Sequence, residues 1–336
     1  MAINSEKQDL DMQSNCKTIL VSGASGIVGY GILKSLKYYK NIKLIGTTIY
    51  NDSVAPAFCD ILEIAPKTDS IEYLDWLFQL IKKHSIDMII PGIEVDMAFW
   101  NNHREKIKSS GAFVLLNNSN LISLCLDKWK FYKKLEKYNF QHRIISTIKP
   151  NYKNIKFPVL LKPRCGFGSK GVVKITNIET LDKYKAQIGN NLMLQEFIDG
   201  DDSEVTASAF FDKNSKMKAY IMFKRELSIN GFTEKAWVFE DSEIKLCIDK
   251  LADFLTPVGP TNFQFRKDSN GKWRLLEINP RISSSTSIRT AFGYNEAKMS
   301  IDYFLYGKKI TQPCVKNGYA IRYMEDCIFY EDSINI

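Results

Sequence analysis

The 336-residue sequence has few of the residues that cross-link extracellular domains or bind zinc. Its seven cysteines lie far apart and form no Cys-x-x-Cys pair, so we expect reduced thiols in a cytoplasmic protein and no disulfide framework. The three histidines, His84, His103 and His142, lack the spacing of zinc ligands. Any metal in this protein is therefore expected to be held by oxygen atoms.

Long apolar runs are also missing. No stretch approaches the roughly 20 apolar residues that cross a bilayer, so we expect no membrane partner. Residues 1–16 lack the apolar segment of a secretory signal and are expected to form a disordered lead. The formal net charge is +8, but the lysines are scattered among acids instead of forming a stripe, which favours solvated lysine-rich faces over a nucleic-acid partner.

Strand-like and helix-like segments alternate from residue 17 to about 117. The strand-like segments are KTILVSG, IKLIGTT, IDMIIPG and AFVLL, with helices expected around 27–38 and 71–83. Such alternation predicts a doubly wound parallel sheet of the α/β class, in which ligands bind beyond the carboxyl ends of the strands. After a basic amphipathic helix, LDKWKFYKKLEKY, strands dominate from residue 157 onward, so the chain changes character there.

The segment PGIEVDM ends the third strand of the first region, where a ligand-binding loop belongs. Glu94 in this loop is a candidate for binding an acceptor amine. The alternative is that polar residues of the loop cap the following helix.

A glycine-rich turn, VSGASGIVGYG at 21–31, has the strand-to-helix context of a dinucleotide-binding turn. Asp52 lies near the offset of a ribose-binding carboxylate, and Tyr152 with Lys156 forms a pair of the kind that short-chain dehydrogenases use. That pair requires one helical face, whereas these two residues lie between Pro150 and a strand. Because glycines at such a turn also permit close packing, an NAD(P)-dependent epimerase or dehydrogenase is the less favoured alternative.

The segment FPVLLKPRCGFGSKGV at 157–172 places Lys162 near the end of a strand, ahead of a glycine loop. Backbone amides without nearby Cβ atoms can approach phosphate oxygens closely, and a lysine adds positive charge. The order of residues is not that of a Walker loop. A flexible hairpin is the alternative for this stretch taken alone. The candidate loop residues are Gly166, Gly168, Ser169, Lys170 and Gly171.

The segment VGPTNFQFRKDSNGKWRLLEINPR at 258–281 predicts two strands joined by a type I′ turn at residues 270–271. The facing cross-strand pairs are then Gln264 with Glu277 and Asn262 with Asn279. These four side chains share one face of the hairpin, while Phe263 and Phe265 point into the core.

Gln264, Glu277 and Asn279 offer a carboxylate and two amide oxygens, which are ligands that suit Mg²⁺. Arg281 follows at the strand end, where it can reach a phosphate. The alternative is ordinary alternation, in which the polar residues form the wet face of a hairpin.

Together these segments resemble the ATP-grasp superfamily, in its carbamoyl-phosphate-synthase large-chain type. The resemblance rests on Asp127-Lys128 at a helix start, the Lys-Pro strand with its glycine loop, the hinge strand LMLQEF, and the motifs NFQF and LLEINPRISSSTS. It implies a pre-ATP-grasp domain over 17–120, followed by an α+β ATP-grasp fold of two sub-domains. The small sub-domain is expected over 121–200, and the large sub-domain with the metal site over 201–336. The single copy, without a visible glutaminase or carbamate half, argues against carbamoyl phosphate synthesis itself.

The resemblance also implies ATP and Mg²⁺ as cofactors, with two ions expected and Mn²⁺ as an alternative. Its phosphate contacts are Lys128 and Lys162, beside the glycine loop. Its adenine and ribose contacts are Glu196, Phe197, Ile198 and Glu204. Its metal ligands are Gln264, Glu277 and Asn279, and Arg281 contacts the transferring phosphate.

Several other charged residues keep two interpretations. In similar proteins the strand-loop-strand FKRELSINGFTEKAWV faces the γ-phosphate and the acceptor, although a solvated basic hairpin is an equal alternative. Its candidate residues are Lys224, Arg225 and Lys235. Asp199, Asp201 and Asp202 surround Gly200 in an expected turn of solvated carboxylates. Arg289 is a candidate either for binding a substrate carboxylate or for capping the following helix.

The function expected from these features is a Mg-ATP-dependent, ADP-forming ligase. A small-molecule carboxylate would attack the γ-phosphate to give an acyl phosphate, which an amine would capture with formation of a C–N bond. A kinase acting on a small molecule at the same site is the alternative. The expected partners are therefore a carboxylate and an amine, and the sequence leaves a homo-oligomer open.

Overall fold

The computed structural model describes residues 16–137, 147–148, 155–166, 171–198, 204–229 and 231–330. The chain divides into two compact units. Unit 1 contains the residues up to Leu116, Arg281–Val315 and the residues from Tyr323 onward, and unit 2 contains Asn117–Pro280 and Lys316–Arg322. Within the described ranges, no helix is long and apolar enough to cross a membrane. The expected lead, apart from Cys16, lies outside the described residues.

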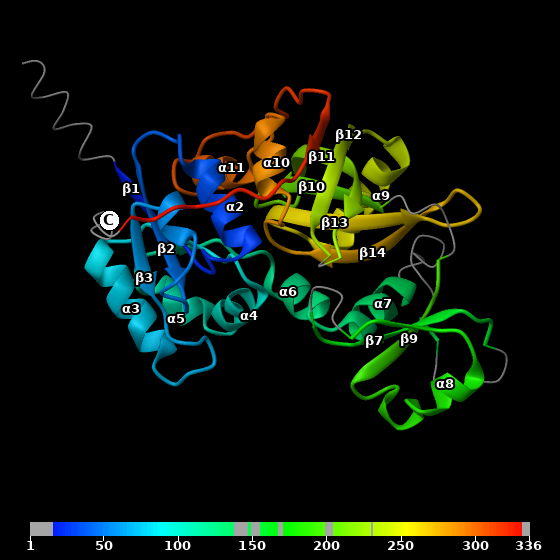
Figure 1. Ribbon diagram of the computed structural model, residues 1–336. Coiled ribbons are helices and arrows are strands. Elements are labelled where there is room, and N and C mark those ends of the chain that lie inside the picture. Colours follow the sequence, from blue (N-terminus) through cyan, green and yellow to red (C-terminus); the bar gives the residue numbers. More distant parts are fainter. Residues whose placement is uncertain are drawn as a thin grey trace, which may run out of the picture. The chain divides into compact units, whose positions relative to one another are not determined.

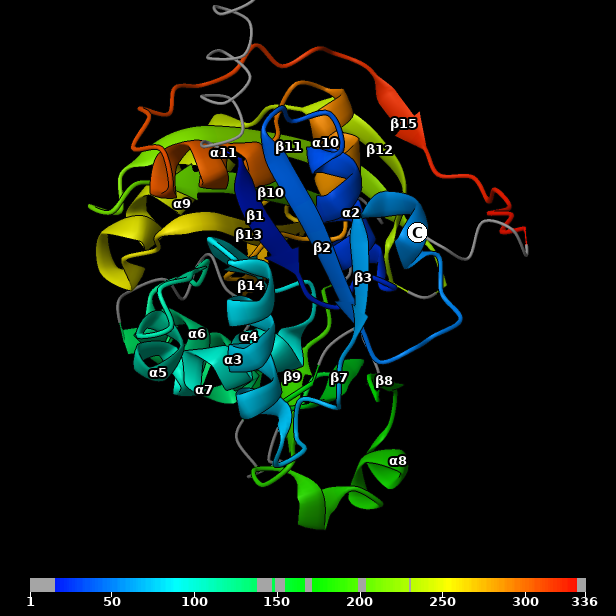
Figure 2. The ribbon, with the colours of Figure 1, turned by 90° about the vertical axis from the view of Figure 1, so that its left-hand side faces the viewer.

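Unit 1 is built on a five-stranded parallel sheet with the strand order β3-β2-β1-β4-β5, and Figure 2 shows β1, β2 and β3 side by side. The strands are β1 (Lys17–Val21), β2 (Ile42–Thr48), β3 (Ile61–Ile64), β4 (Met88–Ile90) and β5 (Phe113–Val114). The helices are α2 (Ile27–Leu36), α3 (Tyr73–His84), α4 (Glu94–Asn102), α5 (Arg104–Lys108), α10 (Thr286–Ala291) and α11 (Glu296–Phe304), with the 3-10 helix η1 (Ala55–Phe58). The predicted doubly wound parallel sheet is confirmed.

Helices from two distant parts of the chain share the core of unit 1. Ile32 and Leu33 of α2 are fully buried with Ile19 of β1, and Ala297 and Ile301 of α11 belong to the same apolar cluster. The segment after residue 280 therefore packs with the parallel sheet, because its apolar face is covered there. This division differs from the expected sub-domain over 201–336.

The glycines of the first strand-to-helix turn allow neighbouring chain segments to pack closely. A Cβ on Gly23 would lie 2.4 Å from Ile93 Cγ2, and one on Gly29 would lie 2.1 Å from the Gly23 carbonyl oxygen. A Cβ on Gly92 would lie 2.0 Å from the Ser22 carbonyl oxygen. These contacts support close packing as the reason for the glycines, in preference to a dinucleotide-binding turn.

The remaining features of that rival interpretation gain no support either. Asp52 is exposed in the segment after β2, and Lys156 lies outside any helix. Tyr152 lies outside the described residues.

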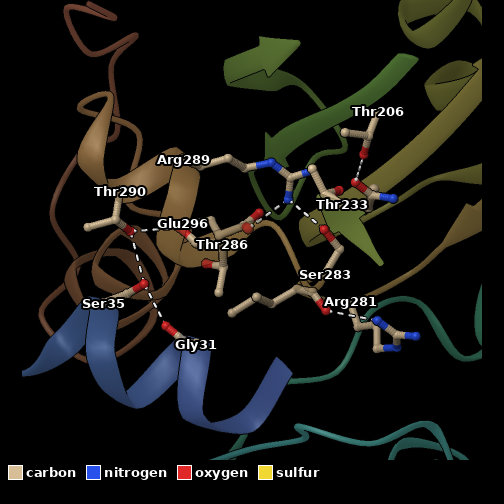
Figure 3. A network of polar contacts seen from close by, with 12 residues as sticks. Gly31, Ser35, Thr206, Thr233, Arg281, Ser283, Thr286, Arg289, Thr290 and Glu296 are labelled. Carbon is tan, nitrogen blue, oxygen red and sulfur yellow. Dashed lines mark hydrogen bonds and ion pairs between the residues drawn. The ribbon is translucent and has the colours of Figure 1, made fainter. Parts of the chain in front are cut away.

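A fully buried ion pair joins α10 to α11 in unit 1. The Arg289 guanidinium donates to Glu296 Oε1 at 2.9 Å and to Ser283 Oγ at 2.8 Å, and neither charged side chain is exposed to solvent (Figure 3). A buried arginine requires such partners because its charge cannot be hydrated. The interpretation of Arg289 as a ligand of a substrate carboxylate is therefore wrong.

Unit 2 contains two antiparallel sheets (Figure 1). The six-stranded sheet has the order β14-β13-β10-β11-β12-β15, and the four-stranded sheet has the order β6-β9-β7-β8. Strands of the larger sheet are β10 (Glu204–Phe211), β11 (Met217–Leu227), β12 (Thr233–Phe239), β13 (Gly259–Lys267), β14 (Trp273–Asn279) and β15 (Tyr319–Ile321). Strands of the smaller sheet are β6 (Thr147–Ile148), β7 (Val159–Pro163), β8 (Val173–Ile175) and β9 (Leu192–Glu196). The helices are α6 (Ser119–Cys125), α7 (Lys128–Lys137), α8 (Ile178–Asp182) and α9 (Ser242–Leu255), with the 3-10 helix η2 (Lys185–Gln187).

Alternation along the strands separates an apolar face of the larger sheet from a polar face. Phe263 and Phe265 of β13 are each 1% exposed and lie in one core cluster with residues of α7 and α9, as predicted. Because successive side chains of a strand point to opposite faces, Asn262 and Gln264 are directed away from this core. The polar face is therefore a consequence of burying the two phenylalanines.

The buried Arg289–Glu296 pair predicts a large loss of stability when one partner is removed. Glu296→Gln removes the carboxylate charge that binds the buried Arg289 guanidinium, so we expect the free energy of unfolding to fall by about 3–5 kcal/mol. Denaturant titration measures this change. Asp249→Asn removes a half-exposed i,i+4 ion pair with Lys245 and should cost at most about 0.5 kcal/mol. Equal losses in the two variants would contradict the assignment.

Candidate active site

The loop between β13 and β14 is longer than the sequence predicts. Asp268 N donates to the Lys272 carbonyl at 2.9 Å, and Gly271 N donates to the Asp268 carbonyl at 2.9 Å. Gly271 has φ +73°, whereas Asn270 is not among the described residues with positive φ. A type I′ turn requires positive φ at both central positions, so the predicted two-residue turn at 270–271 is wrong. A three-residue loop ending in the left-handed glycine takes its place.

A one-residue bulge in β14 nevertheless restores the predicted pairing. Near the loop, Phe265 pairs with Leu275, but after a register shift Gln264 pairs with Glu277 and Asn262 pairs with Asn279. Leu276 is the extra residue, and its carbonyl accepts a hydrogen bond from the Tyr132 hydroxyl of α7. The predicted facing pairs are thus confirmed, although the bulge rather than the turn sets them.

The polar face of this hairpin carries oxygen donors suited to a hard cation. Gln264, Glu277 and Asn279 are half-buried, and Asn279 Nδ2 donates to Glu277 Oε1 at 3.1 Å. Asn262 is buried and accepts a hydrogen bond from Thr206 at 2.7 Å, so it is tied to the neighbouring strand β10. One carboxylate with two amide groups fits the ligand preferences of Mg²⁺. In the described part of the chain, no cluster of three His, Cys, Asp or Glu residues could hold a metal.

The start of α7 is bound to the beginning of the glycine loop. Lys128 N donates to the Arg164 carbonyl at 2.8 Å, and its Nζ donates to the Gly166 carbonyl. Asp127 accepts from Arg164 Nη2 at 2.6 Å. These contacts place Lys128 beside the strand β7, which carries Lys162. The two lysines that the sequence assigned to phosphates therefore lie at one end of the same strand.

Lys162 lies in an electrostatic field set by Glu277 and Lys128. The pKa of Lys162 is lowered to about 8, mainly by burial; Glu277 opposes this decrease, and Lys128 adds a smaller one. Its Nζ lies 5.2 Å from the centroid of the Tyr132 ring. The site thus combines two cations from α7 and β7 with one anion from β14, an arrangement that can bind a metal-complexed polyphosphate.

The hinge candidates lie at the end of β9 and the start of β10. Glu196 is exposed, Ile198 is 8% exposed, and Lys174 Nζ lies 4.0 Å from the centroid of the Phe197 ring. Glu204 begins β10 and is bound by Arg225. The acidic turn at 199–203 lies outside the described residues.

Only part of the glycine loop is described. Gly166 has φ +131° and Gly171 has φ +73°, conformations that favour glycine over other residues. Gly168, Ser169 and Lys170 lie outside the described residues.

The structure pairs two residues that the sequence analysis assigned to different roles. Arg225 of β11 is 5% exposed and binds Glu204, while its Nη1 donates to Thr233 Oγ1 at 3.2 Å. The contact between Glu204 and Arg225 forms because the two residues are direct partners in the β10–β11 ladder. Lys235 of β12 lies opposite Glu226 and forms an ion pair with it at 2.9 Å. Lys224, one residue before Arg225, is exposed.

Arg281 belongs to unit 1, although it follows Asn279 by only two residues along the chain. Its Nη2 lies 3.5 Å from Glu94 Oε2. Two candidates 187 positions apart in the sequence are therefore brought together.

Sequence reasoning missed Tyr132, which contacts both sides of the candidate site. It bonds to the bulged strand and lies under Lys162. Its position four residues after Lys128 on an expected helix puts both on one face, and this spacing was the available signal.

Comparisons with known proteins identify similar families and a similar relative. A family model described as "ATP-grasp in the biosynthetic pathway with Ter operon" matches residues 189–327, and one described as "PylC-like, N-terminal domain" matches residues 27–115. The carbamoyl phosphate synthase large chain of Archaeoglobus fulgidus is 25% identical over 243 residues, which cover 66% of this chain and 22% of that protein. This chain thus spans about a fifth of the length of that relative.

Solved structures share the fold at low sequence identity. N5-carboxyaminoimidazole synthetase from Staphylococcus aureus has a TM-score of 0.70 at 17% identity, covering 89% of this chain and 80% of its own. Biotin carboxylase from Campylobacter jejuni has a TM-score of 0.72 at 16% identity, with 92% and 75% covered. L-amino acid ligase from Bacillus licheniformis has a TM-score of 0.64 at 13% identity, with 86% and 74% covered.

Lys162 predicts a pH-dependent affinity for phosphates. With a pKa of about 8, the Lys162 side chain is mostly protonated at pH 7 and mostly neutral at pH 9. We expect the affinity for a non-hydrolysable Mg-ATP analogue to fall about 10-fold over that range in calorimetric titrations. Lys162→Arg should abolish this decrease, and Lys183→Arg at an exposed position should retain it. An unchanged decrease in Lys162→Arg would contradict the role of this lysine.

The lowered pKa of Lys162 also makes the stability of the unliganded protein depend on pH. This stability changes with pH in the direction opposite to the phosphate affinity. An unfolded chain keeps the lysine proton up to the ordinary pKa of 10.5, so it binds more protons than the folded chain between pH 8 and 10.5. The Lys162 contribution to the free energy of unfolding should therefore rise with pH in that window. Denaturant unfolding of the wild type and of Lys162→Arg, compared at pH 8 and at pH 10.5, isolates the contribution of Lys162 to the free energy of unfolding.

Proposed function

We propose that this chain, which belongs to the ATP-grasp superfamily, is an ATP-dependent ligase that joins a small-molecule carboxylate to an amine and releases ADP. One observation carries the proposal. Gln264 and Glu277 form a pair on the polar face of the β13–β14 hairpin, and the Glu277 charge raises the pKa of Lys162, which lies near the end of β7 ahead of the glycine loop. The names of the similar proteins, which include synthetases, carboxylases and a ligase, support the reaction class.

The residues at the site divide the work of phosphoryl transfer. Lys128 and Lys162 would neutralise the phosphates from the side of α7 and β7. Gln264, Glu277 and Asn279 would hold Mg²⁺, as one ion or two, with Mn²⁺ as an alternative. The metal would offset charge between the phosphates as a Lewis acid.

The remaining residues would position the reactants. Glu196, Phe197 and Ile198 would receive the adenine, Glu204 the ribose, and Gly166 to Gly171 would cover the phosphates. Arg281 would contact the phosphate in transfer, with Arg225 and Lys235 on the acceptor side. The carboxylate oxygen attacks the γ-phosphorus, the bond to ADP breaks, and the amine nitrogen then displaces phosphate from the acyl carbon.

Such a reaction needs no nucleophilic side chain. The attacking atom belongs to the substrate, so the protein contributes position and charge. This agrees with a site in which amides, lysines and one carboxylate converge.

A substrate screen tests the reaction class. Release of ADP should depend on a carboxylate and rise further with an amine, measured across amino acids, other carboxylates and amino sugars. Hydroxylamine should trap the activated carboxylate as a hydroxamate. A stable phosphorylated product that yields no hydroxamate would reject the ligase in favour of a kinase.

Glu277→Ala tests the metal assignment. Removal of the carboxylate should lower ATP turnover by at least about 100-fold, because the charge that holds the cation is lost. The thermal unfolding midpoint should stay near that of the wild type, since Glu277 lies outside the core cluster. Glu179→Ala, at an exposed position of α8, serves as the control and should turn over ATP normally. Full activity of Glu277→Ala would refute the assignment.

A further inference from the structure

The ion pair of Glu94 and Arg281 links two distant parts of the chain within unit 1. Glu94 is the first residue of α4 and follows β4 at the carboxyl edge of the parallel sheet. The side chains are 18% and 15% exposed, respectively. Their charges are therefore screened by solvent only in part.

The backbone around Glu94 is held in place from both sides. Gly92 N donates to Ser22 Oγ at 3.2 Å, and the close approach of Gly92 to the Ser22 carbonyl leaves no room for a Cβ. Two residues after Glu94, the buried Asp96 accepts from Thr68 Oγ1 at 2.6 Å. The backbone on either side of Glu94 is thus held by a bond to Ser22, which follows β1, and by a bond to the segment before α3.

One nitrogen of the Arg281 guanidinium is held by a hydrogen bond, and another can still donate a hydrogen bond. Its Nη1 donates to the carbonyl of Ile282 at 3.0 Å, and Ile282 is 1% exposed in the core of unit 1. Its Nε is buried and has no hydrogen-bond partner among the described residues. The 3.5 Å distance to Glu94 exceeds the length of a strong charge-assisted hydrogen bond. Glu94 therefore directs the guanidinium, while Nη2, held among the described residues only by this long contact, keeps donor capacity for an anion.

We propose that Glu94 is a positioning residue, which holds Arg281 in the orientation that stabilises the phosphoryl group during transfer. The inference rests on the proposed function. It differs from the interpretation of Glu94 as the ligand of the acceptor amine. Here the Glu94 side chain acts during phosphoryl transfer, which is the step before the amine takes part.

A planar phosphoryl mimic tests this role without knowledge of the substrates. MgADP with aluminium fluoride places an anion where the transferring phosphoryl group would lie. The measured quantity is the factor by which aluminium fluoride tightens MgADP binding. Glu94→Gln should reduce this factor about 10-fold while MgADP alone binds as to the wild type, and Glu94→Asp should recover part of it.

A double-mutant cycle with Arg281→Lys shows whether Glu94 acts through the arginine. Adding Glu94→Gln to Arg281→Lys should cause no further loss, because the group that Glu94 positions has already been replaced. Glu63→Gln is the matched control, since it removes a half-buried acid paired with Lys83 and His84 in the same unit. That variant should behave as the wild type.

Two results would overturn the inference: an unchanged factor in Glu94→Gln, or losses that add in the double variant. An unchanged factor with a raised KM for the amine would assign Glu94 to the acceptor instead. Failure of the wild type to bind MgADP would reject the proposed function, which separates the two failures.

Discussion

The pairing of Gln264 with Glu277 across β13 and β14 is the constraint on which the candidate site depends. A strand has a side-chain period of two, so a slip of one residue would turn Glu277 away from Gln264 and toward the core. The burial of Ile278 on β14 opposes such a slip, because the slip would turn this apolar side chain to the polar face. Core packing and site geometry are thus two consequences of one register.

The bulge at Leu276 reconciles that register with the loop. A three-residue loop ending at Gly271 starts the ladder one position away from the pairing that the core requires, and the extra residue absorbs the difference. The Tyr132 hydroxyl satisfies the carbonyl of the bulged residue. This contact also connects the hairpin to α7, the helix that begins with Lys128, so a local irregularity becomes part of the polar site.

Unit 1 contributes a different kind of constraint. Its parallel sheet is joined by α10 and α11, which follow β14 in the sequence, and a buried Arg289–Glu296 pair ties these two helices together. Asn279 and Arg281 consequently belong to different units despite their proximity in the chain. The partner of Arg281 is an acid from the first third of the sequence, so the environment of this arginine depends on the packing of unit 1.

The sequence by itself determined the parallel sheet of unit 1, the apolar face of β13 and the shared face of Glu277 and Asn279 on β14. These features follow from local alternation, in which period and burial agree. Only the tertiary structure decided that Leu276 forms a bulge, that Arg225 binds Glu204 and that Arg281 meets Glu94. Each of these depends on which segments pack together across long separations in the chain, and residue spacing carries no record of that packing.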